Sequence, residues 1–298
     1  YDISADALGY PESYYTPPAE VLDKIEIVRG AASLEYGTQF GGIINFKMKS
    51  GDTTKKAEFI SRLSTGSWKF FNTSSSIGGT VNKLNYYAFY QHKSGNGWRP
   101  NSGFNVNTGY LSLTLKATSR LSVTAQYTHM DYLEQQPGGL NDEMFATDPQ
   151  QSTKARNWFK VNWNLGAVLI DYSISQHLKF NSRFFGLLGN RSALGIINTV
   201  IDPGEGWPRN YRKDDYTNWG NESRFIYTYN TKKNNPFVLL AGVRYYHGYT
   251  NRQIGYGDGG SGGTKSDFTF DKSTEYDSLS YSRYTFPNHN IALFAENI

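Results

Sequence analysis

The sequence has no cysteine among its 298 residues. A disulfide framework, a thiol nucleophile and a thiolate metal site are therefore excluded. Long apolar runs are also missing, because the longest ones, such as residues 237–243, are far shorter than the roughly 20 residues that a membrane-spanning helix requires. An α-helical membrane protein is thus excluded. A membrane β-barrel is not, since its strands alternate apolar and polar residues.

The sequence also lacks a strong excess of positive or negative charge. The chain has 30 Lys and Arg against 26 Asp and Glu, and this balance gives no indication of a nucleic-acid partner. The five histidines are isolated and show no metal-ligand spacing: His92, His129, His177, His247 and His289. We therefore expect no catalytic residues, no metal site and no cofactor, and we predict that the protein is not an enzyme.

Aromatic residues are abundant, at 16%, and 30 glycines are spread along the chain, a profile typical of β-proteins. From about residue 56 onward, apolar and polar residues alternate in segment after segment, as they do in residues 110–115 and 121–128. We count ten such segments, at residues 55–65, 68–79, 83–94, 104–117, 119–133, 156–175, 179–192, 218–230, 236–253 and 286–298. Each segment predicts a strand with one apolar face.

The connections between these segments alternate between tight turns and long loops, except for a tight first hairpin at residues 65–67. The long ones are residues 93–103, 134–155, 193–217 and 254–286. This alternation predicts a transmembrane antiparallel up-and-down β-barrel with tight turns at one rim. Aromatic residues near the strand ends are expected at the membrane interfaces: Tyr86, Tyr87, Tyr127, Tyr132, Trp158, Trp163, Tyr227, Tyr229, Tyr245 and Tyr246.

The first fifty residues do not share this alternating pattern. A proline-containing loop precedes a mildly helical stretch at residues 19–24, and two short strands are expected at residues 25–28 and 43–48. We therefore divide the chain into a small α/β region, residues 1–50, and a barrel region, residues 51–298. The chain begins at Tyr1 without a methionine or signal segment and stops within an alternating segment, so we interpret both ends as cut.

Residues 25–37, IEIVRGAASLEYG, followed by GGIINF at residues 41–46, resemble the end of the plug domain of TonB-dependent outer-membrane receptors. The chain departs from the family pattern at Ala31, where proline is usual, and at Glu35, where an apolar residue is common. Residues 290–297 resemble a mid-barrel strand of the family. The resemblance assigns the plug motif and the plug–barrel contact to Glu26, Arg29, Gly30, Tyr36, Gly37, Gly41 and Gly42. In the family this arginine faces acidic residues of the barrel.

The resemblance implies active uptake of a ferric chelate, a siderophore or ferric citrate, across the outer membrane of a Gram-negative bacterium. It also implies a plug inside a barrel of 22 strands, of which this chain carries about ten. The partners would be TonB with its inner-membrane energising complex and outer-membrane lipid. Ten strands leave two open edges, so the remaining strands and the TonB box are expected outside this sequence. A passive porin or adhesin barrel, a receptor for cobalamin or an oligosaccharide, and a secreted β-sandwich or propeller that binds sugar are the alternatives.

An anionic chelate requires cationic donors near the outer vestibule, and arginine suits carboxylates because its planar fork binds them through two hydrogen bonds. Residues 207–213, WPRNYRK, form the densest basic and aromatic cluster, with an ordinary solvated loop as the competing interpretation. We assign candidate substrate contacts to Arg99, Trp207, Arg209, Tyr211, Arg212 and Arg252. The sequence leaves open the identity of the substrate, the barrel partners of Arg29, and whether a signalling domain or a surface lipoprotein accompanies the receptor.

Overall fold

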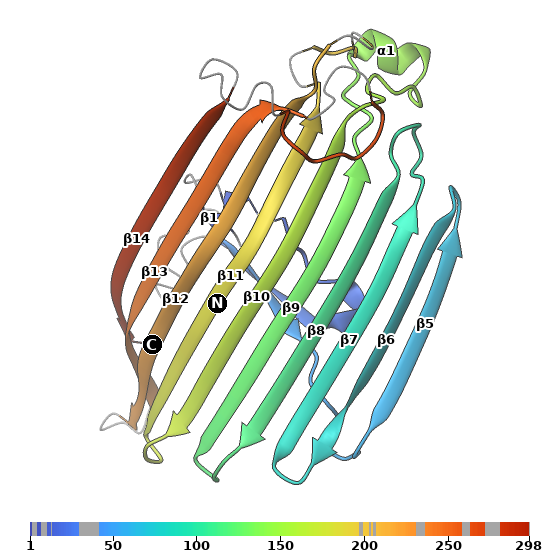
Figure 1. The fold of residues 1–298 in the computed structure, drawn as a ribbon. Coiled ribbons are helices and arrows are strands. Elements are labelled where there is room, and N and C mark those ends of the chain that lie inside the picture. Colours follow the sequence, from blue (N-terminus) through green and yellow to red (C-terminus); the bar gives the residue numbers. More distant parts are fainter. Residues whose placement is uncertain are drawn as a thin grey trace.

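A ten-stranded antiparallel sheet dominates the computed structural model, which describes residues 1, 5–6, 11–12, 14–29, 42–196, 199–202, 204, 207–230, 236–257, 263–271 and 281–297. Each strand pairs with the next one along the chain. The strands are β5 (Glu58–Gly66), β6 (Phe70–Val81), β7 (Leu84–Gly95), β8 (Phe104–Lys116), β9 (Leu121–Gln135), β10 (Trp158–Ser173), β11 (Leu178–Gly195), β12 (Asn210–Asn230), β13 (Pro236–Tyr256) and β14 (Ser282–Asn297). They form a curved wall with β5 and β14 at its open edges (Figure 1). The predicted barrel strands are thus confirmed.

The connections follow the predicted rule. Tight turns lie at the lower edge of the wall and the long loops at the upper edge (Figure 1). The short first hairpin turns at the upper edge, where Trp68 and Lys69 adopt positive φ angles of 55° and 56°. A short helix, α1 (Asp142–Thr147), interrupts the loop after β9, and the side chain of Asn141 caps it by accepting a hydrogen bond from the Met144 N–H at 2.8 Å.

The predicted strand limits are wrong at the upper edge. Strand β12 begins at Asn210 rather than at residue 218, and β14 begins at Ser282 rather than at residue 286. Tyr211 and Arg212, which we had placed in a loop, lie in β12 and pair with both β11 and β13. The strand continues because its long neighbours on both sides offer backbone partners, which outweighs the polar composition of these residues.

The N-terminal residues form small elements on the concave side of the wall (Figure 1). These are β1 (Ala5–Asp6), β2 (Pro11–Glu12), the 3₁₀ turn η1 (Ala19–Val21), β3 (Leu22–Val28) and β4 (Ile43–Met48). The helical stretch predicted at residues 19–24 is wrong beyond one turn. Residues 22–24 belong to β3 instead, because they pair with β4.

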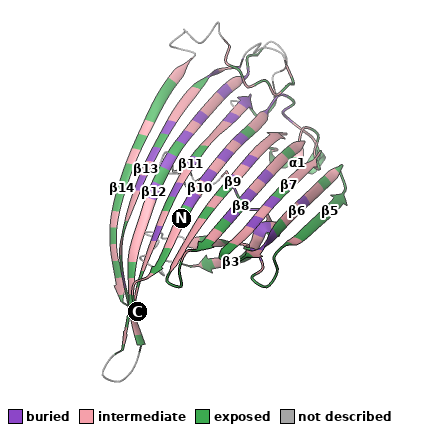
Figure 2. Cartoon of the chain, turned by 60° about the horizontal axis from the view of Figure 1, so that its bottom comes forward, coloured by how far each residue is buried: buried purple, intermediate pink, exposed green. Residues whose placement is uncertain are grey.

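Alternate side chains of each strand point to opposite faces of the wall. Large apolar side chains lie exposed on the convex face, among them Leu113, Val168 and Leu293, whereas Gln91, Thr108 and Thr128 are buried on the concave face among aromatic residues. Buried residues concentrate on the middle strands, against which the N-terminal segment lies (Figure 2). This distribution of an apolar outside and a polar inside is the one expected of a membrane barrel.

The aromatic residues predicted at the membrane interfaces separate by face. Tyr127 and Tyr227 are exposed on the convex face, at 47% and 45%. Tyr87, Trp163 and Tyr246 are buried on the concave face, so their assignment to an interface girdle is wrong. The reason is the two-residue period, which places each of them one position away from an outward residue of the same strand.

Two buried clusters join the N-terminal segment to the wall. Val21 is fully buried against Tyr87, Phe89 and Tyr110, with Met48 at the margin. In the second cluster, Tyr15 packs with Met130 and Trp163, among other residues of β9 to β12. A polar contact adds to these clusters, since the Asn72 side chain of β6 donates a hydrogen bond to the Glu20 carboxylate at 3.0 Å. The N-terminal segment is therefore packed against the inner wall.

Candidate functional site

Four charged side chains meet on the concave face near the upper edge. Arg191 of β11, Asp214 of β12 and Arg252 of β13 are cross-strand neighbours in one register row. Asp214 is fully buried, and its carboxylate accepts hydrogen bonds from Arg191 Nε at 2.7 Å and from Arg252 Nε and Nη2 at 2.6 and 3.2 Å. Arg212, two residues before Asp214 on the same face, brings its Nε to 3.4 Å from the same carboxylate. We call these four residues the arginine cluster.

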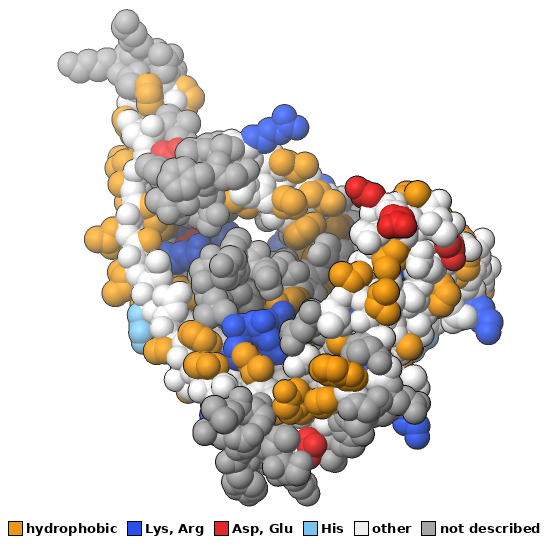
Figure 3. Space-filling view, turned by 90° about the horizontal axis from the view of Figure 1, so that it is seen from above, with side chains coloured by type: hydrophobic (Ala, Val, Ile, Leu, Met, Phe, Trp, Pro, Cys, Tyr) orange, Lys and Arg blue, Asp and Glu red, His pale blue; other side chains and the backbone are white. Residues whose placement is uncertain are grey.

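The arginine cluster carries an excess of positive charge. Three guanidinium groups contact one carboxylate, so the formal charges of the four residues sum to +2. Arg191 and Arg252 are 13% exposed, whereas Arg212 is 36% exposed and is the member most accessible from the hollow. Seen from above, Lys and Arg side chains lie within the hollow that the wall encloses (Figure 3). Such a group of partly buried guanidiniums attracts anions that carry carboxylate or phosphate oxygens.

Aromatic rings surround the arginine cluster and connect it to the N-terminal segment. The Arg191 guanidinium lies over the Tyr14 ring at 5.2 Å, and the Arg252 guanidinium lies over the Phe286 ring at 5.6 Å. Tyr14 also stacks on Tyr216, with 6.3 Å between the ring centroids. A ligand that changes the position of Arg191 therefore acts directly on a residue of the N-terminal segment.

The structure separates the six predicted substrate residues. Arg212 and Arg252 meet in the arginine cluster, whereas Arg99 lies under the loop that contains α1 and donates to the carbonyl oxygens of Gln151 and Gly138 at 2.6 to 2.9 Å. The Arg209 guanidinium is buried and donates to the Lys265 carbonyl at 2.6 Å.

Of the two aromatic candidates, Tyr211 is 2% exposed and packs on Phe270 at 4.3 Å, whereas the Trp207 side chain is 61% exposed. Four of the six candidates thus lie outside the arginine cluster, and their contact with a substrate stays a prediction.

Sequence reasoning did not select Asp214 and did not include Arg191 among the substrate contacts. The signal was present in the two-residue period, since Arg212, Asp214 and Tyr216 alternate with outward residues and must share the concave face. The register that brings Arg191 beside Asp214 depends on the length of the loop between β11 and β12, and the sequence does not show it.

The described part of the plug motif lies on β3, directly after β3 and directly before β4. Glu26 accepts a hydrogen bond from the Asn45 amide at 2.9 Å and forms an ion pair with Lys24 at 2.7 Å, so its described partners belong to these two strands. Arg29 is exposed at the end of β3, and no ion pair joins it to another described residue. Gly42 has a φ of 101°, which a residue with a side chain rarely adopts. The motif residues Gly30, Tyr36, Gly37 and Gly41 lie outside the described residues, and the contact of Arg29 with a barrel stays a prediction.

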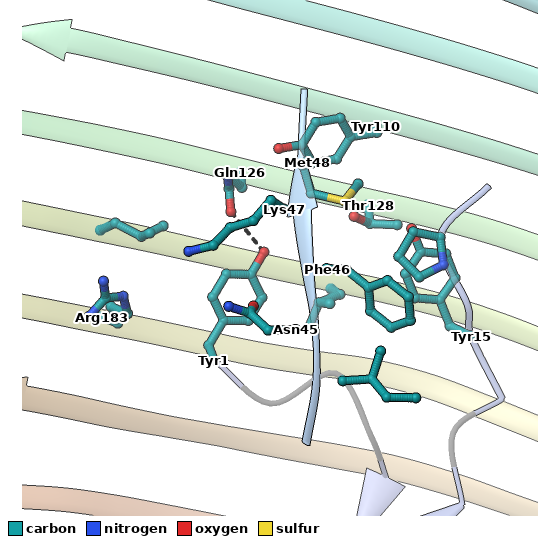
Figure 4. A pocket seen from close by; sticks show the side chains of 14 residues that line it. Tyr1, Tyr15, Asn45, Phe46, Lys47, Met48, Tyr110, Gln126, Thr128 and Arg183 are labelled. Carbon is teal, nitrogen blue, oxygen red and sulfur yellow. Dashed lines mark hydrogen bonds between the residues drawn. The ribbon is translucent and has the colours of Figure 1, made fainter. Parts of the chain in front are cut away.

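A cavity of about 280 Å³ lies between β4 and strands β8 to β11 (Figure 4). Tyr15, Phe46, Tyr110, Gln126 and Arg183 contribute to its lining. Tyr1 also lines it, and the Tyr1 hydroxyl donates a hydrogen bond to the Gln126 side-chain oxygen at 2.8 Å. The wall and β4 are thus in partial contact, and polar groups lie along the gap between them.

The loops above the arginine cluster are held by a buried ion pair. Arg156, 3% exposed, donates to both Asp202 oxygens at 2.6 to 3.2 Å and to the Trp207 carbonyl at 3.0 Å. The Lys154 ammonium donates to the Thr199 carbonyl at 2.5 Å. The Arg156 hydrogen bond keeps the pKa of the Asp202 carboxyl below its ordinary value. This pair ties Asp202 and Trp207, in the connection between β11 and β12, to the residues that precede β10.

Acid is expected to loosen this loop. Because the Asp202 pKa is lowered in the folded protein, its stabilising contribution is complete at neutral pH and is lost as the pH falls below the ordinary carboxyl value through the lowered one. Amide hydrogen exchange in residues 199–202 and 207–209 should therefore rise on acidification, after correction for the intrinsic exchange rate. Asp202→Asn should show fast exchange in this loop already at neutral pH. Equal protection of the loop in the variant and the wild type at neutral pH would contradict the role of the pair.

Among the described residues, no group of three or more histidine and carboxylate side chains is placed to hold a metal ion. No helix among them is long and apolar enough to cross a membrane.

No family model matches the chain. Among solved structures, it is similar to the ferric citrate transporter FecA in its unliganded form, with a TM-score of 0.71 and 19% identity over 94% of this chain and 41% of that one. It is also similar to the copper transporter OprC, with a TM-score of 0.73 and 13% identity over 99% of this chain and 44% of that one. A third is the ferripyoverdine receptor of the outer membrane of Pseudomonas aeruginosa bound to ferripyoverdine, with a TM-score of 0.72 and 11% identity over 93% and 39%.

The TM-scores show a common fold, and at identities below 20% the similarity shows the fold alone. The chain spans about two fifths of the length of each of the three structures. The resemblance to TonB-dependent receptors that residues 25–46 carry is confirmed at the level of the fold. The three structures are of transporters and a receptor rather than of enzymes.

Proposed function

We propose that this chain belongs to a TonB-dependent outer-membrane receptor of a Gram-negative bacterium that imports an anionic ferric chelate. Residues 1–50 would form the last part of its plug and residues 51–298 the first half of its barrel. The convex apolar face, the packing of the N-terminal segment on the concave face and the common fold support this assignment.

The arginine cluster is the observation that carries the proposed substrate class. Its excess positive charge disfavours a bare metal cation and favours a metal that is wrapped in carboxylate or other anionic ligands. Ferric citrate and siderophores with free carboxylates have this chemistry. Cobalamin and neutral oligosaccharides do not require such a group of guanidiniums.

The position of Tyr14 suggests how binding would reach the plug. A chelate that binds Arg212 and Arg191 competes with the contact between the Arg191 guanidinium and the Tyr14 ring. The N-terminal segment is held to the described wall by two small clusters and a few hydrogen bonds, an attachment that can be loosened and restored. TonB and its inner-membrane complex would supply the energy by pulling on the plug. The whole cycle is inferred from the family.

Uptake by a deletion strain that expresses the full-length protein tests the proposed function. The panel consists of ferric citrate, carboxylate siderophores, a neutral ferric siderophore, cupric ion, cobalamin and a neutral oligosaccharide. We expect energy-dependent uptake of at least one anionic ferric chelate. Uptake that continues without TonB would favour the passive porin. Uptake of cobalamin or the oligosaccharide alone would reject a ferric chelate as the substrate.

Arg212→Gln should weaken binding of the transported chelate about tenfold, the effect of losing one charge-assisted hydrogen bond. Lys213→Gln is the matched control, because Lys213 has the same exposed fraction of 36% but points to the convex face, where it pairs with Asp215. Isothermal titration of the purified receptor measures both. Equal affinities for the two variants would exclude the arginine cluster as the substrate site.

Val168→Arg tests the membrane assignment. Val168 is exposed on the apolar convex face of β10, so arginine there should lower the stability of the inserted protein by about 2–4 kcal/mol. Tyr172 lies on the same face of the same strand, next to the turn at the lower edge, and Tyr172→Arg should cost about 0–1 kcal/mol. Urea unfolding in lipid bilayers measures the two values. Equal effects would mean that this face does not lie in lipid.

A further inference from the structure

A second group of charged residues lies on the concave face, nearer the lower edge. Arg183 of β11, Glu222 of β12 and Arg244 of β13 are cross-strand neighbours in one register row. Arg224 lies two residues beyond Glu222 and therefore on the same face of β12. The formal charges of these four residues sum to +2. We call them the lower cluster.

The lower cluster repeats the plan of the arginine cluster. Arg183 lies eight residues before Arg191 on β11, which runs from the lower edge to the upper edge (Figure 1). Because this number is even, both side chains face the same way, roughly 27 Å apart at about 3.4 Å per residue. In each row, a carboxylate of β12 lies between an arginine of β11 and an arginine of β13. Two positively charged rows thus follow one another down the inner wall.

The two rows differ in how the carboxylate is bound. Glu222 Oε1 is 4.0 Å from Arg183 Nη1 and 3.8 Å from Arg224 Nη1, and both distances are too long for a hydrogen bond. The Arg183 side chain is 23% exposed, and its guanidinium donates no hydrogen bond to any residue that the structure describes. Its N–H groups are therefore available to another acceptor.

The cavity between β4 and the wall ends at Arg183. Along β10, its lining extends from Leu165 to Leu169, and Leu169 is the cross-strand neighbour of Arg183. From β4, Lys47 extends toward the same end of the cavity (Figure 4). The Lys47 ammonium is 3.8 Å from the Glu26 carboxylate, and within the described residues it donates no hydrogen bond. Two cationic side chains, one from the wall and one from the N-terminal segment, thus face one space.

The rest of the lining suits a small polar anion. None of the described residues that line the cavity is acidic, and Asn45, Gln126 and Thr128 add side-chain N–H and O–H groups. The cavity volume of about 280 Å³ is just below the roughly 300–1,000 Å³ of sites for drug-sized ligands. A guanidinium on the wall and an ammonium on β4 favour an anion with more than one carboxylate.

We propose that Arg183 and Lys47 form an anion site in which a small polycarboxylate joins the N-terminal segment to the wall. One carboxylate accepts hydrogen bonds from the Arg183 guanidinium, and another contacts the Lys47 ammonium. The anion offsets the repulsion between the two like charges that the packing of β4 on the wall brings to one cavity. Because binding requires both sides, the anion stabilises the packed arrangement by mass action. The site is separate from the arginine cluster and does not depend on which substrate the protein imports.

A single cysteine tests the charge of the site, because this chain has none of its own. Leu169→Cys, as the only cysteine of the full-length protein in detergent, places a thiol beside Arg183. A negatively charged methanethiosulfonate reagent should label it about tenfold faster than a positively charged one, the effect of one charge-assisted interaction. Adding Arg183→Gln should bring the two rates together, whereas Arg183→Lys should preserve the difference. Lys179→Gln is the matched control, because Lys179 lies on the same face of β11 but is not among the residues that line the cavity.

Citrate is the probe for the anion itself. With a dissociation constant on the order of 1 mM, citrate at about 10 mM would occupy roughly nine tenths of the sites and slow labelling by an uncharged reagent about tenfold. Amide hydrogen exchange in β4 should slow as well, because the bound anion joins β4 to the wall. Triethyl citrate, which has the same skeleton without the charges, should do neither. Both effects should be lost in Lys47→Gln and should remain in Arg212→Gln, which changes the arginine cluster alone.

Equal labelling by the two charged reagents, or equal protection by citrate and triethyl citrate, would overturn the anion site. Protection of the thiol without slower exchange in β4 would overturn the connection between the N-terminal segment and the wall. Faster labelling by every reagent after Arg183→Gln, with no effect of citrate on Leu169→Cys, would mean that Arg183 holds the N-terminal segment directly. Chelate uptake is measured in parallel. Citrate protection without chelate uptake would reject the proposed function alone, and chelate uptake without citrate protection would reject this site alone.

Discussion

Asp214→Asn should destabilise the folded protein by about 3–5 kcal/mol, the usual cost of removing one partner from a buried ion pair. The Asp214 carboxylate is fully buried and is the shared partner of Arg191, Arg212 and Arg252. An amide at this position cannot offset three guanidinium charges, so they would repel one another in surroundings with little access to water. Substitution of the central anion is therefore expected to weaken the wall where β11, β12 and β13 meet.

Two further variants test whether the loss of stability comes from the unpaired guanidinium charges. Asp215→Asn changes the neighbouring residue, which is 37% exposed on the other face and pairs with Lys213 at 3.2 Å, so about 0–1 kcal/mol is expected. Replacing Arg191, Arg212, Asp214 and Arg252 together by apolar residues of similar size should restore much of the stability, because no charge of the arginine cluster then remains unpaired. Urea unfolding of the full-length protein in lipid bilayers measures all three. A loss for Asp214→Asn no larger than that for Asp215→Asn would show that the arginines find other partners.

The strands of the wall could be predicted because each carries its own signal. In residues 121–128, every second residue is apolar, and this pattern holds whatever the neighbours do. The upper limits of β11, β12 and β14 could not be predicted in the same way. Asn210 to Thr217 have the polar composition of a loop, and they form a strand because β11 and β13 flank them with backbone donors and acceptors.

The candidate site was predictable by residue type but not by position. A demand for cationic side chains led to Arg212 and Arg252, and the structure places both beside Asp214. The same demand also led to Arg99 and Arg209, which donate to loop carbonyls instead. Arginine stabilises loops and binds anions through the same donors, so composition cannot distinguish the two uses. The face of the strand and the register between strands make that distinction.

The junction between the N-terminal segment and the wall depends on one glycine. A Cβ added at Gly51 would lie 2.3 Å from the Tyr86 carbonyl oxygen, and 2.4 and 2.5 Å from backbone atoms of Gly79. Asn85 binds both backbone groups of Gly51, through hydrogen bonds of 3.1 and 2.7 Å. Thr80 continues the contact by donating to the Asp52 carbonyl at 3.0 Å. Residues 51 and 52, which connect the N-terminal segment to the wall, are therefore packed closely against β6 and β7.

Gly51→Val is therefore expected to prevent assembly of most of the protein rather than merely weaken it. The contacting atoms belong to the backbone of paired strands, so no side-chain rotation can relieve the overlap, and the linker or the sheet must move. Gly66→Val is the matched control, because a Cβ there meets its nearest atoms, in the Phe70 side chain, at ordinary contact distances of 3.5 Å or more. The fraction of the full-length protein that is recovered in the membrane fraction in a heat-modifiable, folded form measures the difference. Normal assembly of Gly51→Val would mean that residue 51 does not need to lie so close to β6 and β7, and the N-terminal segment would then be held to the wall by its other contacts, such as the clusters around Tyr15 and Val21.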